Sequence, residues 1–402
     1  MKQPTSAITT PKRSWKARIM CSGLAWLLLV MPLITSCHSH DDPEPDPTVQ
    51  TILWYFPWSG NDYDAGLYYH FRSNITEVEL AIKERKTMAN ARLLVCLASR
   101  PYEATLFEIK YEGNKILRDT LVQYSNINFT SEETILRVIN DTKGYAPALR
   151  YGMMIGCHGL GWVPASHLAT ARQAPRRRYF GGEKGYRTDI TTLASAISNS
   201  NTHMDFILFD DCYMANIEVA YDLRHVTDHL IASTSEIMAR GLPYQDLWAH
   251  LSPTPQFSEV CNSYYDFYST YTYPYGTLAA IDCREIDTFA ALMRQANETH
   301  TLSINDTYRV QQLDGYAPAV FFDCGDYIAK LCADDPALVN QLNDVLQRLV
   351  PSKVATKKIF SVLNGSHTID VNTFSGITIS DPTINTNFVD EKTRTAWWQA
   401  TH

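Results

Sequence analysis

The 402-residue sequence lacks the features that mark several common classes of protein. Its nine cysteines include no Cys-x-x-Cys pair and no zinc-ligand spacing, which excludes the usual structural zinc sites. Its net charge is −8, so it lacks the basic excess typical of proteins that bind nucleic acid. It also has no internal repeat and no long low-complexity segment. With 45% hydrophobic residues, the chain is expected to form a substantial core in one large domain or two ordinary ones.

An apolar run near the N-terminus, residues 23–34, is too short to cross a membrane. It runs into Leu33-Ile34-Thr35-Ser36-Cys37, which resembles a bacterial lipobox with cleavage before Cys37 and a lipid on its thiol. An ordinary signal peptide and an uncleaved anchor helix are the alternatives. The run is preceded by the basic residues of a targeting signal, which are Lys12, Arg13, Lys16 and Arg18.

The chain is therefore divided into three segments. Residues 1–36 are predicted to be a lipoprotein signal peptide, and residues 37–50, rich in Asp, Glu and Pro, an acidic flexible tether. Residues 51–402 are predicted to form the folded domain, with a helix-rich subdomain from about residue 243. This organisation predicts a protein anchored by lipid in the bacterial cell envelope, and leaves open whether it faces the periplasm or the cell surface.

The cysteines after the lipobox have irregular spacing. Several lie within apolar runs, as Cys96 and Cys157 do. Free cysteine packs like a small hydrophobic residue, so most of these are expected to be buried free thiols.

Apolar, β-prone runs alternate with helical patterns along the folded domain, which predicts an α/β sandwich with a largely parallel sheet. Strands are expected at 51–56, 92–98, 105–109 at an edge, 151–157, 206–209, 229–234 and, last in the sheet, 277–281. Helices are expected to end near Lys86 and to span 131–140, 189–197, 215–223, 327–332, 338–349 and 393–400, with a hairpin at 369–379.

Two of these buried strands end in residues that suit a nucleophile and its base. His158 follows the strand at 151–157, and Cys212 follows the strand at 206–209. Because the carboxyl ends of neighbouring parallel strands meet at one edge of a sheet, the imidazole and the thiol are expected to come together there. A lone cysteine in an apolar run is usually part of the core, so the spacing alone is weak evidence.

The residues around this pair resemble the clostripain family of cysteine peptidases, from about residue 52 to the C-terminus. The resemblance lies in His158-Gly159 and in Asp210-Asp211-Cys212-Tyr213-Met214-x-Asn216-x-Glu218. It implies a caspase-like α/β/α sandwich with a largely parallel central sheet and a helix-rich C-terminal part. The caspase nucleophile signature itself is absent, although the histidine-to-cysteine spacing is of the caspase kind.

A His/Cys dyad follows from the resemblance and from thiol chemistry. Cys212 is the predicted nucleophile, and His158 the predicted general base and acid. An imidazole and a helix that begins just after Cys212 would both favour the thiolate. The backbone N–H groups of Gly159 and Cys212 are the predicted oxyanion hole. Glycine at position 159 would let the chain approach the substrate closely.

The acids near Cys212 bear on specificity, because the resemblance implies cleavage after Arg or Lys. Asp210 shares a strand face with Cys212, which places its carboxylate on the pocket floor. Glu236 is a candidate second acid, with a structural pair as the alternative, and Asp211 is expected to cap the next helix. The sequence departs from the commoner family pattern at Asp211, where a small residue is usual, and Arg240 would weaken a basic preference.

The segment at 164–187 is expected to be an exposed loop, because it is long and lacks apolar periodicity. The resemblance implies cleavage between the histidine and the cysteine, so self-cleavage is predicted here. A basic loop that is never cut is the alternative. The candidate cleavage sites are Arg172, Arg176, Arg177 and Arg178.

Together these features predict a lipid-anchored cysteine endopeptidase, monomeric or two-chain after processing, that acts on proteins or peptides with basic residues. No metal site or required cofactor is predicted, and the sequence does not indicate whether calcium is needed. The rival hypotheses are a catalytically silent binding lipoprotein with the same fold and a cysteine hydrolase of non-peptide amides.

Overall fold

The computed structural model describes residues 48–60, 66–165, 180–182, 185–307, 309–363 and 365–402. The chain divides into two units, Met1–Pro45 and Asp46–His402. The predicted signal peptide, Cys37 and nearly all of the tether lie outside the described residues. Among the helices that are described, none is both long and apolar enough to span a membrane.

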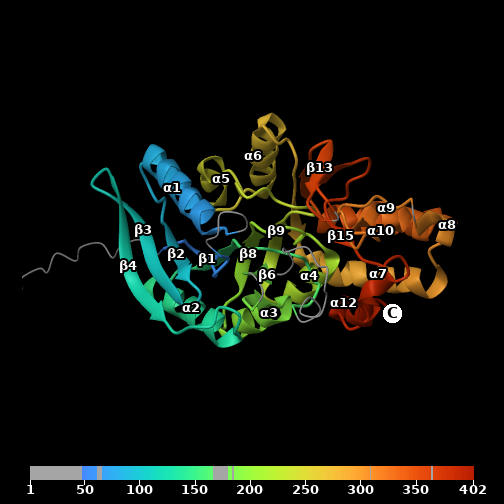
Figure 1. Ribbon diagram of the computed structural model, residues 1–402, viewed down its shortest axis with the longest axis horizontal. Coiled ribbons are helices and arrows are strands. Elements are labelled where there is room, and N and C mark those ends of the chain that lie inside the picture. The colour runs from blue at the N-terminus through green and yellow to red at the C-terminus, as the bar shows by residue number, and fades with distance from the viewer. Residues whose placement is uncertain (1–47, 61–65, 166–179, 183–184, 308, 364) are drawn as a thin grey trace, which may run out of the picture. The chain divides into compact units, whose positions relative to one another are not determined.

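A nine-stranded mixed sheet forms the centre of the larger unit (Figure 1). Its five central strands, β9, β8, β5, β1 and β2, are parallel, and two antiparallel strands flank them at each side. In spatial order the strands are β12 (Ser352–Ala355), β10 (Thr277–Asp282), β9 (Thr227–Ala232), β8 (Met204–Phe209), β5 (Arg150–Ile155), β1 (Gln50–Phe56), β2 (Ala91–Arg100), β3 (Glu103–Glu112) and β4 (Lys115–Ser125).

Helices cover both faces of the sheet, as Figure 1 shows. Side chains alternate along β1, so that Leu53 and Tyr55 face one layer while Ile52 and Trp54 face the other. The layer on the Trp54 side holds α1 (Tyr68–Arg85), α5 (Tyr244–Leu251) and α6 (Phe257–Thr270). The layer on the Tyr55 side includes α2 (Glu132–Tyr145), α3 (Ile190–Asn199), α4 (Ile217–Leu223), α7 (Ile286–Thr299) and α10 (Pro336–Leu349). This is the predicted α/β/α sandwich.

Local chemistry explains where helices near the site begin. The Ser131 hydroxyl accepts a hydrogen bond from Thr134 N at 3.2 Å and caps α2, as its sequence predicts. Asn216 caps α4, because its Oδ1 accepts from Val219 N at 3.0 Å. The prediction that a helix begins at residue 215 is therefore slightly early, and four residues separate Cys212 from the first residue of α4.

Three predictions about the sheet and the tail are wrong. The strand at 105–109 does not lie at an edge, because β4 pairs outside it. The strand at 277–281 is not the last one, since β12 pairs beyond it. Residues 369–379 form no hairpin of their own: β14 (His367–Asp370) pairs with β13 (Lys358–Ser361), and β15 (Thr378–Ile379) pairs with β11 (Phe322–Asp323).

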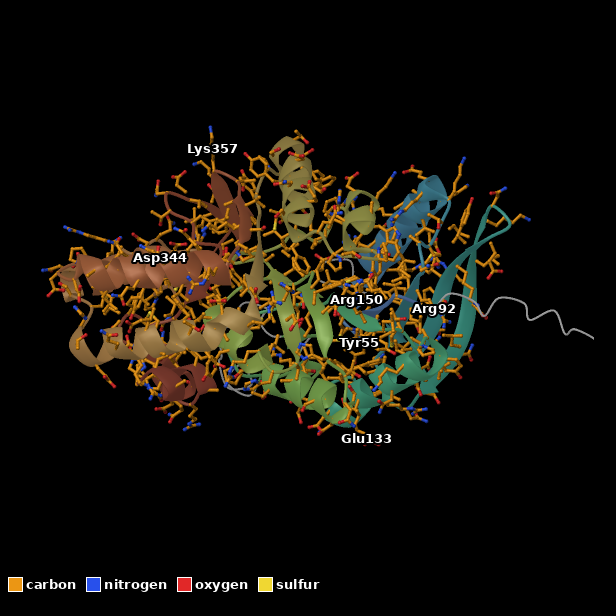
Figure 2. The ribbon with its side chains drawn as sticks, turned by 180° about the vertical axis from the view of Figure 1, so that it is seen from behind. Tyr55, Arg92, Glu133, Arg150, Asp344 and Lys357 are labelled. Carbon is orange, nitrogen blue, oxygen red and sulfur yellow. The ribbon has the colours of Figure 1, made fainter. Side chains whose placement is uncertain are left out.

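The C-terminal part packs against the sheet through helices and short strands. It includes α8 (Ile304–Thr307), α9 (Cys324–Leu331), α11 (Val389–Lys392) and α12 (Ala396–Thr401). A fully buried ion pair between Lys392 and Glu218 joins α11 to α4. Figure 2 shows Asp344 of α10 and Lys357 at the opposite side of this unit from Arg92 at the start of β2.

Candidate active site

A cavity of about 130 Å³ lies beyond the carboxyl ends of β5 and β8. His158 and Cys212, which follow these two strands, both line it, together with Gly159. Asp210 and Glu236 line the same cavity. The structure thus brings together every predicted site residue within the described part of the chain. The candidate cleavage sites Arg172, Arg176, Arg177 and Arg178 lie outside the described residues.

Cys212 differs from the other cysteines of the described chain in its exposure. Seven free cysteines are described there, and six are buried, whereas Cys212 is partly exposed. The Ile237 N–H donates to Cys212 Sγ at 3.4 Å. The thiol in turn donates to Ile237 O at 3.8 Å. The helix N-terminus that the sequence predicts next to Cys212 is absent there, because α4 begins at Ile217. The buried thiols have raised pKa values because burial disfavours their ionised form; that of Cys283 is one example.

His158 is held by backbone hydrogen bonds to a short strand, β6 (Phe180–Gly181). Its N–H donates to Gly181 O at 3.0 Å, and Gly181 N donates to His158 O at 3.0 Å. β6 pairs in turn with β7 (Arg187–Thr188), so the predicted loop at 164–187 contains a small ribbon at its end. The chain position of His158 is therefore determined from two sides, by β5 and by β6.

Gly159 is required by the close packing of the two segments that carry the dyad. A Cβ atom at this position would lie 2.5 Å from Cys212 O and 2.7 Å from Asp211 Cβ. The absence of a side chain at Gly159 thus makes room for the segment that carries Cys212. The sequence had suggested instead that it makes room for the substrate. Within the described residues, Gly159 N donates no hydrogen bond to a backbone carbonyl, which suits its predicted role in an oxyanion hole.

Asp210 is buried at the cavity, and only one of its oxygens has a hydrogen-bond partner among the described residues. Its Oδ2 accepts from the Tyr244 hydroxyl at 2.6 Å and from Leu242 N at 3.3 Å. Its Oδ1 is buried and has no hydrogen-bond partner among the described residues. Burial raises the pKa of Asp210 to about 6, although the hydrogen bonds from Tyr244 and Leu242 oppose this shift. A buried oxygen without a partner is costly, so this site is suited to receive a donor from a ligand.

The guanidinium group of Arg240 does not bond to Asp210 Oδ1. It forms an ion pair with Glu77 of α1 at 2.5 Å and lies over the ring of Phe267, 5.4 Å from the ring centroid. The Arg240 charge, which the sequence suggested would weaken a preference for basic substrate residues, is thus paired with the Glu77 carboxylate.

Glu236 accepts three hydrogen bonds at one of its two carboxylate oxygens. Its Oε1 accepts from the Tyr213 hydroxyl at 2.9 Å, from Ser361 Oγ at 2.7 Å and from Val362 N at 2.8 Å. Tyr213, directly after Cys212, has a left-handed backbone with φ of 62°. Glu236 thus holds the residue next to the nucleophile and ties it to β13. These contacts favour the structural alternative for Glu236.

Asp211 does not cap a helix, so that prediction is wrong. Its side chain turns toward β5, where Oδ1 accepts from Cys157 N at 2.5 Å and Oδ2 from Cys157 Sγ at 3.2 Å. Burial, and secondarily the nearby Asp210 charge, raises the pKa of Asp211 to about 8, against the hydrogen bonds from Cys157. The cap fails because the chain makes a further turn at Tyr213 before α4 begins.

Sequence reasoning did not identify several residues that shape the cavity. One wall comes from α1, including His70 and Asn74, and the Asn74 amide donates to Arg240 O at 3.1 Å. Another comes from Val362 and Leu363, which follow β13. These residues lie far from the dyad in the sequence and carry no motif. Within the described ranges, no group of three or more His, Cys, Asp or Glu side chains is placed to hold a metal ion.

Comparison with known proteins identifies the family of the chain. Residues 62–391 match the model of the clostripain family of peptidases, C11. The chain belongs to the clostripain family. A comparison with curated protein sequences gave no match.

Solved structures of clostripain-family proteases resemble the chain closely. A secreted C11 cysteine protease of Bacteroides thetaiotaomicron, iotapain, is 44% identical over 89% of this chain and 100% of its own, with a TM-score of 0.82. A clostripain of the same species, in complex with the peptide inhibitor BTN-VLTK-AOMK, is 49% identical over 56% of this chain and 99% of its own, with a TM-score of 0.53. An inactive zymogen C11 protease of Parabacteroides distasonis is 25% identical over 89% and 99% of the two chains, with a TM-score of 0.75. The predicted caspase-like fold is confirmed, and the chain is a cysteine protease.

Proposed function

We propose that the chain hydrolyses peptide bonds through Cys212 as nucleophile and His158 as general base and acid. His158 accepts the thiol proton, Cys212 Sγ attacks the scissile carbonyl, and the histidine returns the proton to the leaving amine. The Gly159 and Cys212 N–H groups bind the oxyanion, and water then hydrolyses the thioester. A thiol and an imidazole suffice for these steps, so the reaction itself needs no cofactor.

One observation carries the proposal. The partly exposed cysteine and the histidine line one cavity with a buried carboxylate, and one oxygen of that carboxylate has no partner among the described residues. This combination supplies a nucleophile, a base and a binding position for a cationic side chain in one place.

The test is hydrolysis of peptidyl amides by the purified protein beside Cys212→Ala and His158→Ala. Each substitution is expected to reduce activity to background while circular dichroism and thermal unfolding stay close to wild type. Cys332→Ala, at a buried thiol that follows α9, is the matched control and should be fully active. Wild-type activity in Cys212→Ala would refute the assignment, as would activity confined to non-peptide amides.

We further propose that the enzyme cleaves after Lys or Arg. Asp210 Oδ1 is available for an ammonium or guanidinium group, and Arg240 is paired with Glu77. The peptide part of the inhibitor bound by the 49%-identical relative, VLTK, ends in lysine, which supports the same preference. Profiling on a peptide library should show Lys or Arg before the cleaved bond; a preference for acidic or apolar residues there would contradict the proposal.

Self-cleavage between residues 164 and 187 is a third proposal, with Arg172 and Arg176-Arg177-Arg178 as the expected sites. The existence of an inactive zymogen among the relatives supports regulated activation. β5 precedes the segment and β8 follows it, and the two strands pair, so both pieces should stay associated. Wild type should give two bands on a denaturing gel and one species in gel filtration, whereas Cys212→Ala should stay intact. Fully active, uncut wild type would rule out obligatory processing.

We also propose that the protein is lipid-anchored in the cell envelope through Cys37. The lipobox-like Leu33–Cys37 segment supports this. Palmitate should label the wild type and not Cys37→Ala, and the label should partition with membranes. A wild-type protein found only in soluble, unlabelled form would refute the anchor.

A further inference from the structure

The residues that directly precede the two dyad members bond to each other. Cys157 precedes His158, and Asp211 precedes Cys212. Asp211 Oδ1 accepts from Cys157 N at 2.5 Å, and Asp211 Oδ2 accepts from Cys157 Sγ at 3.2 Å. Both side chains are buried, with 1% exposure for Asp211 and 3% for Cys157. A carboxyl group is thus enclosed between the two segments that carry the reacting groups.

This contact begins where the backbone pairing of the two strands stops. The β5–β8 register ends at Ile155 opposite Phe209, and Asp210 N donates the last backbone bond, to Ile155 O at 2.8 Å. The dyad residues lie two or three positions further along each chain. Beyond the sheet, the Asp211 side chain therefore connects the segment after β5 with the segment after β8, and it replaces the backbone hydrogen bonds that join the two strands.

The Cys157 thiol also connects to the strand that holds His158. Gly181 N donates to Cys157 Sγ at 3.1 Å as well as to His158 O. The sulfur donates to Asp211 and accepts from Gly181, so both of its hydrogen-bonding roles are used. On the other side, Gly159 packs so closely on Asp211 Cβ and Cys212 O that no side chain would fit between them. The two segments are thus fixed by polar contacts and by packing.

We propose that Asp211 and Cys157 are positioning residues, which fix the separation and orientation of His158 and Cys212 for proton transfer. The inference rests on the proposed dyad. A misplacement of about 1 Å between reacting groups costs on the order of 100-fold in rate, so loss of this contact should affect turnover more than substrate binding. Burial raises the pKa of both the Asp211 carboxyl and the Cys157 thiol.

The experiment compares Asp211→Ala, Asp211→Asn and Asp323→Ala in the full chain. Asp211→Ala should lower kcat about 100-fold and leave KM within about threefold. Asp211→Asn should restore most of kcat, because its amide oxygen can still accept from Cys157 N. Asp323 is an equally buried acid that accepts from Ser375 N and Asp326 N and does not line the cavity, so Asp323→Ala controls for lost stability. Its kcat per active site should equal wild type.

Alkylation of Cys212 by iodoacetamide gives a second readout, independent of substrate. Its rate should fall in Asp211→Ala and not in Asp323→Ala, because the thiolate depends on the placed imidazole. Should Asp211→Ala fail to fold, Cys157→Ala decides: kcat should fall about tenfold and Cys157→Ser should restore it. Wild-type kcat in Asp211→Ala, or in Cys157→Ala, would overturn the inference. Activity in Cys212→Ala would instead refute the dyad.

Discussion

The two acids on the walls of the cavity differ in how the protein uses them. On the α1 side, Asp210 has a buried oxygen without a hydrogen-bond partner among the described residues, whereas on the β13 side Glu236 Oε1 accepts three hydrogen bonds. Both carboxylates line the cavity and both are mostly buried. Glu236 Oε1 ties Tyr213 to β13, and we propose that Asp210 is the acid that binds a cationic substrate side chain. Burial near a nucleophile therefore does not by itself identify a specificity residue.

Removing the charge of Asp210 is expected to have the largest effect. Asp210→Asn should reduce the kcat/KM ratio of lysine over norleucine substrates by about two to four orders of magnitude, because breaking one side of a buried ion pair costs about 3–5 kcal/mol. Asp205→Asn, at the other end of β8 and paired with Arg150, is the matched control and should keep the preference. An unchanged ratio in Asp210→Asn would move the pocket elsewhere.

Removing Glu236 should instead affect stability. Glu236→Ala leaves the donors of Tyr213, Ser361 and Val362 without their acceptor, which should cost at least about 1–3 kcal/mol in the free energy of unfolding. Urea unfolding measures this loss, and Glu236→Gln should recover much of it. The lysine preference of Glu236→Ala should stay near wild type. A collapse of that preference with unchanged stability would reverse the roles of the two acids.

The pH dependence of the substrate preference should distinguish the roles of the two acids more finely. Asp210 attracts a cation only when ionised, and its pKa is raised to about 6 by burial. The kcat/KM ratio of the lysine substrate over the norleucine substrate should therefore rise with pH through about 6. One pH unit below this pKa, the ratio should be about tenfold lower than its plateau at high pH. The norleucine substrate cancels titration of the dyad. In Asp210→Asn the ratio should be flat, and a slope that persists in this variant would assign the titration to another group.

The sequence predicts the parallel centre of the sheet well, because β1, β5 and β8 are continuous apolar runs buried on both faces. It fails for β4, which is mostly exposed and polar, and for β12, which has only four residues. The partner of β15 is β11, more than 50 residues upstream, and it leaves no local signal. β14 instead forms a hairpin with β13, with only five residues between the two strands, so the hairpin predicted at 369–379 lies too late in the chain.

The site shows the same division. His158, Cys212 and Asp210 follow from strand ends and alternation, together with the family resemblance, and the structure places them in one cavity. The contacts of Asp211 could not be inferred, because the left-handed turn at Tyr213 delays α4 and turns the Asp211 side chain toward β5. The α1 wall depends on packing across the sheet, which no spacing of residues encodes.

The most direct test of the proposed site measures where, and how fast, a peptidyl electrophile ending in lysine attaches to the protein. Mass spectrometry after brief treatment should locate the adduct on Cys212, with attachment at least about tenfold faster than for the norleucine analogue. In Asp210→Asn the two reagents should react at similar rates, still at Cys212. Attachment at Cys157 or another thiol, or an equal rate for both reagents in the wild type, would contradict the proposed roles of Cys212 and Asp210.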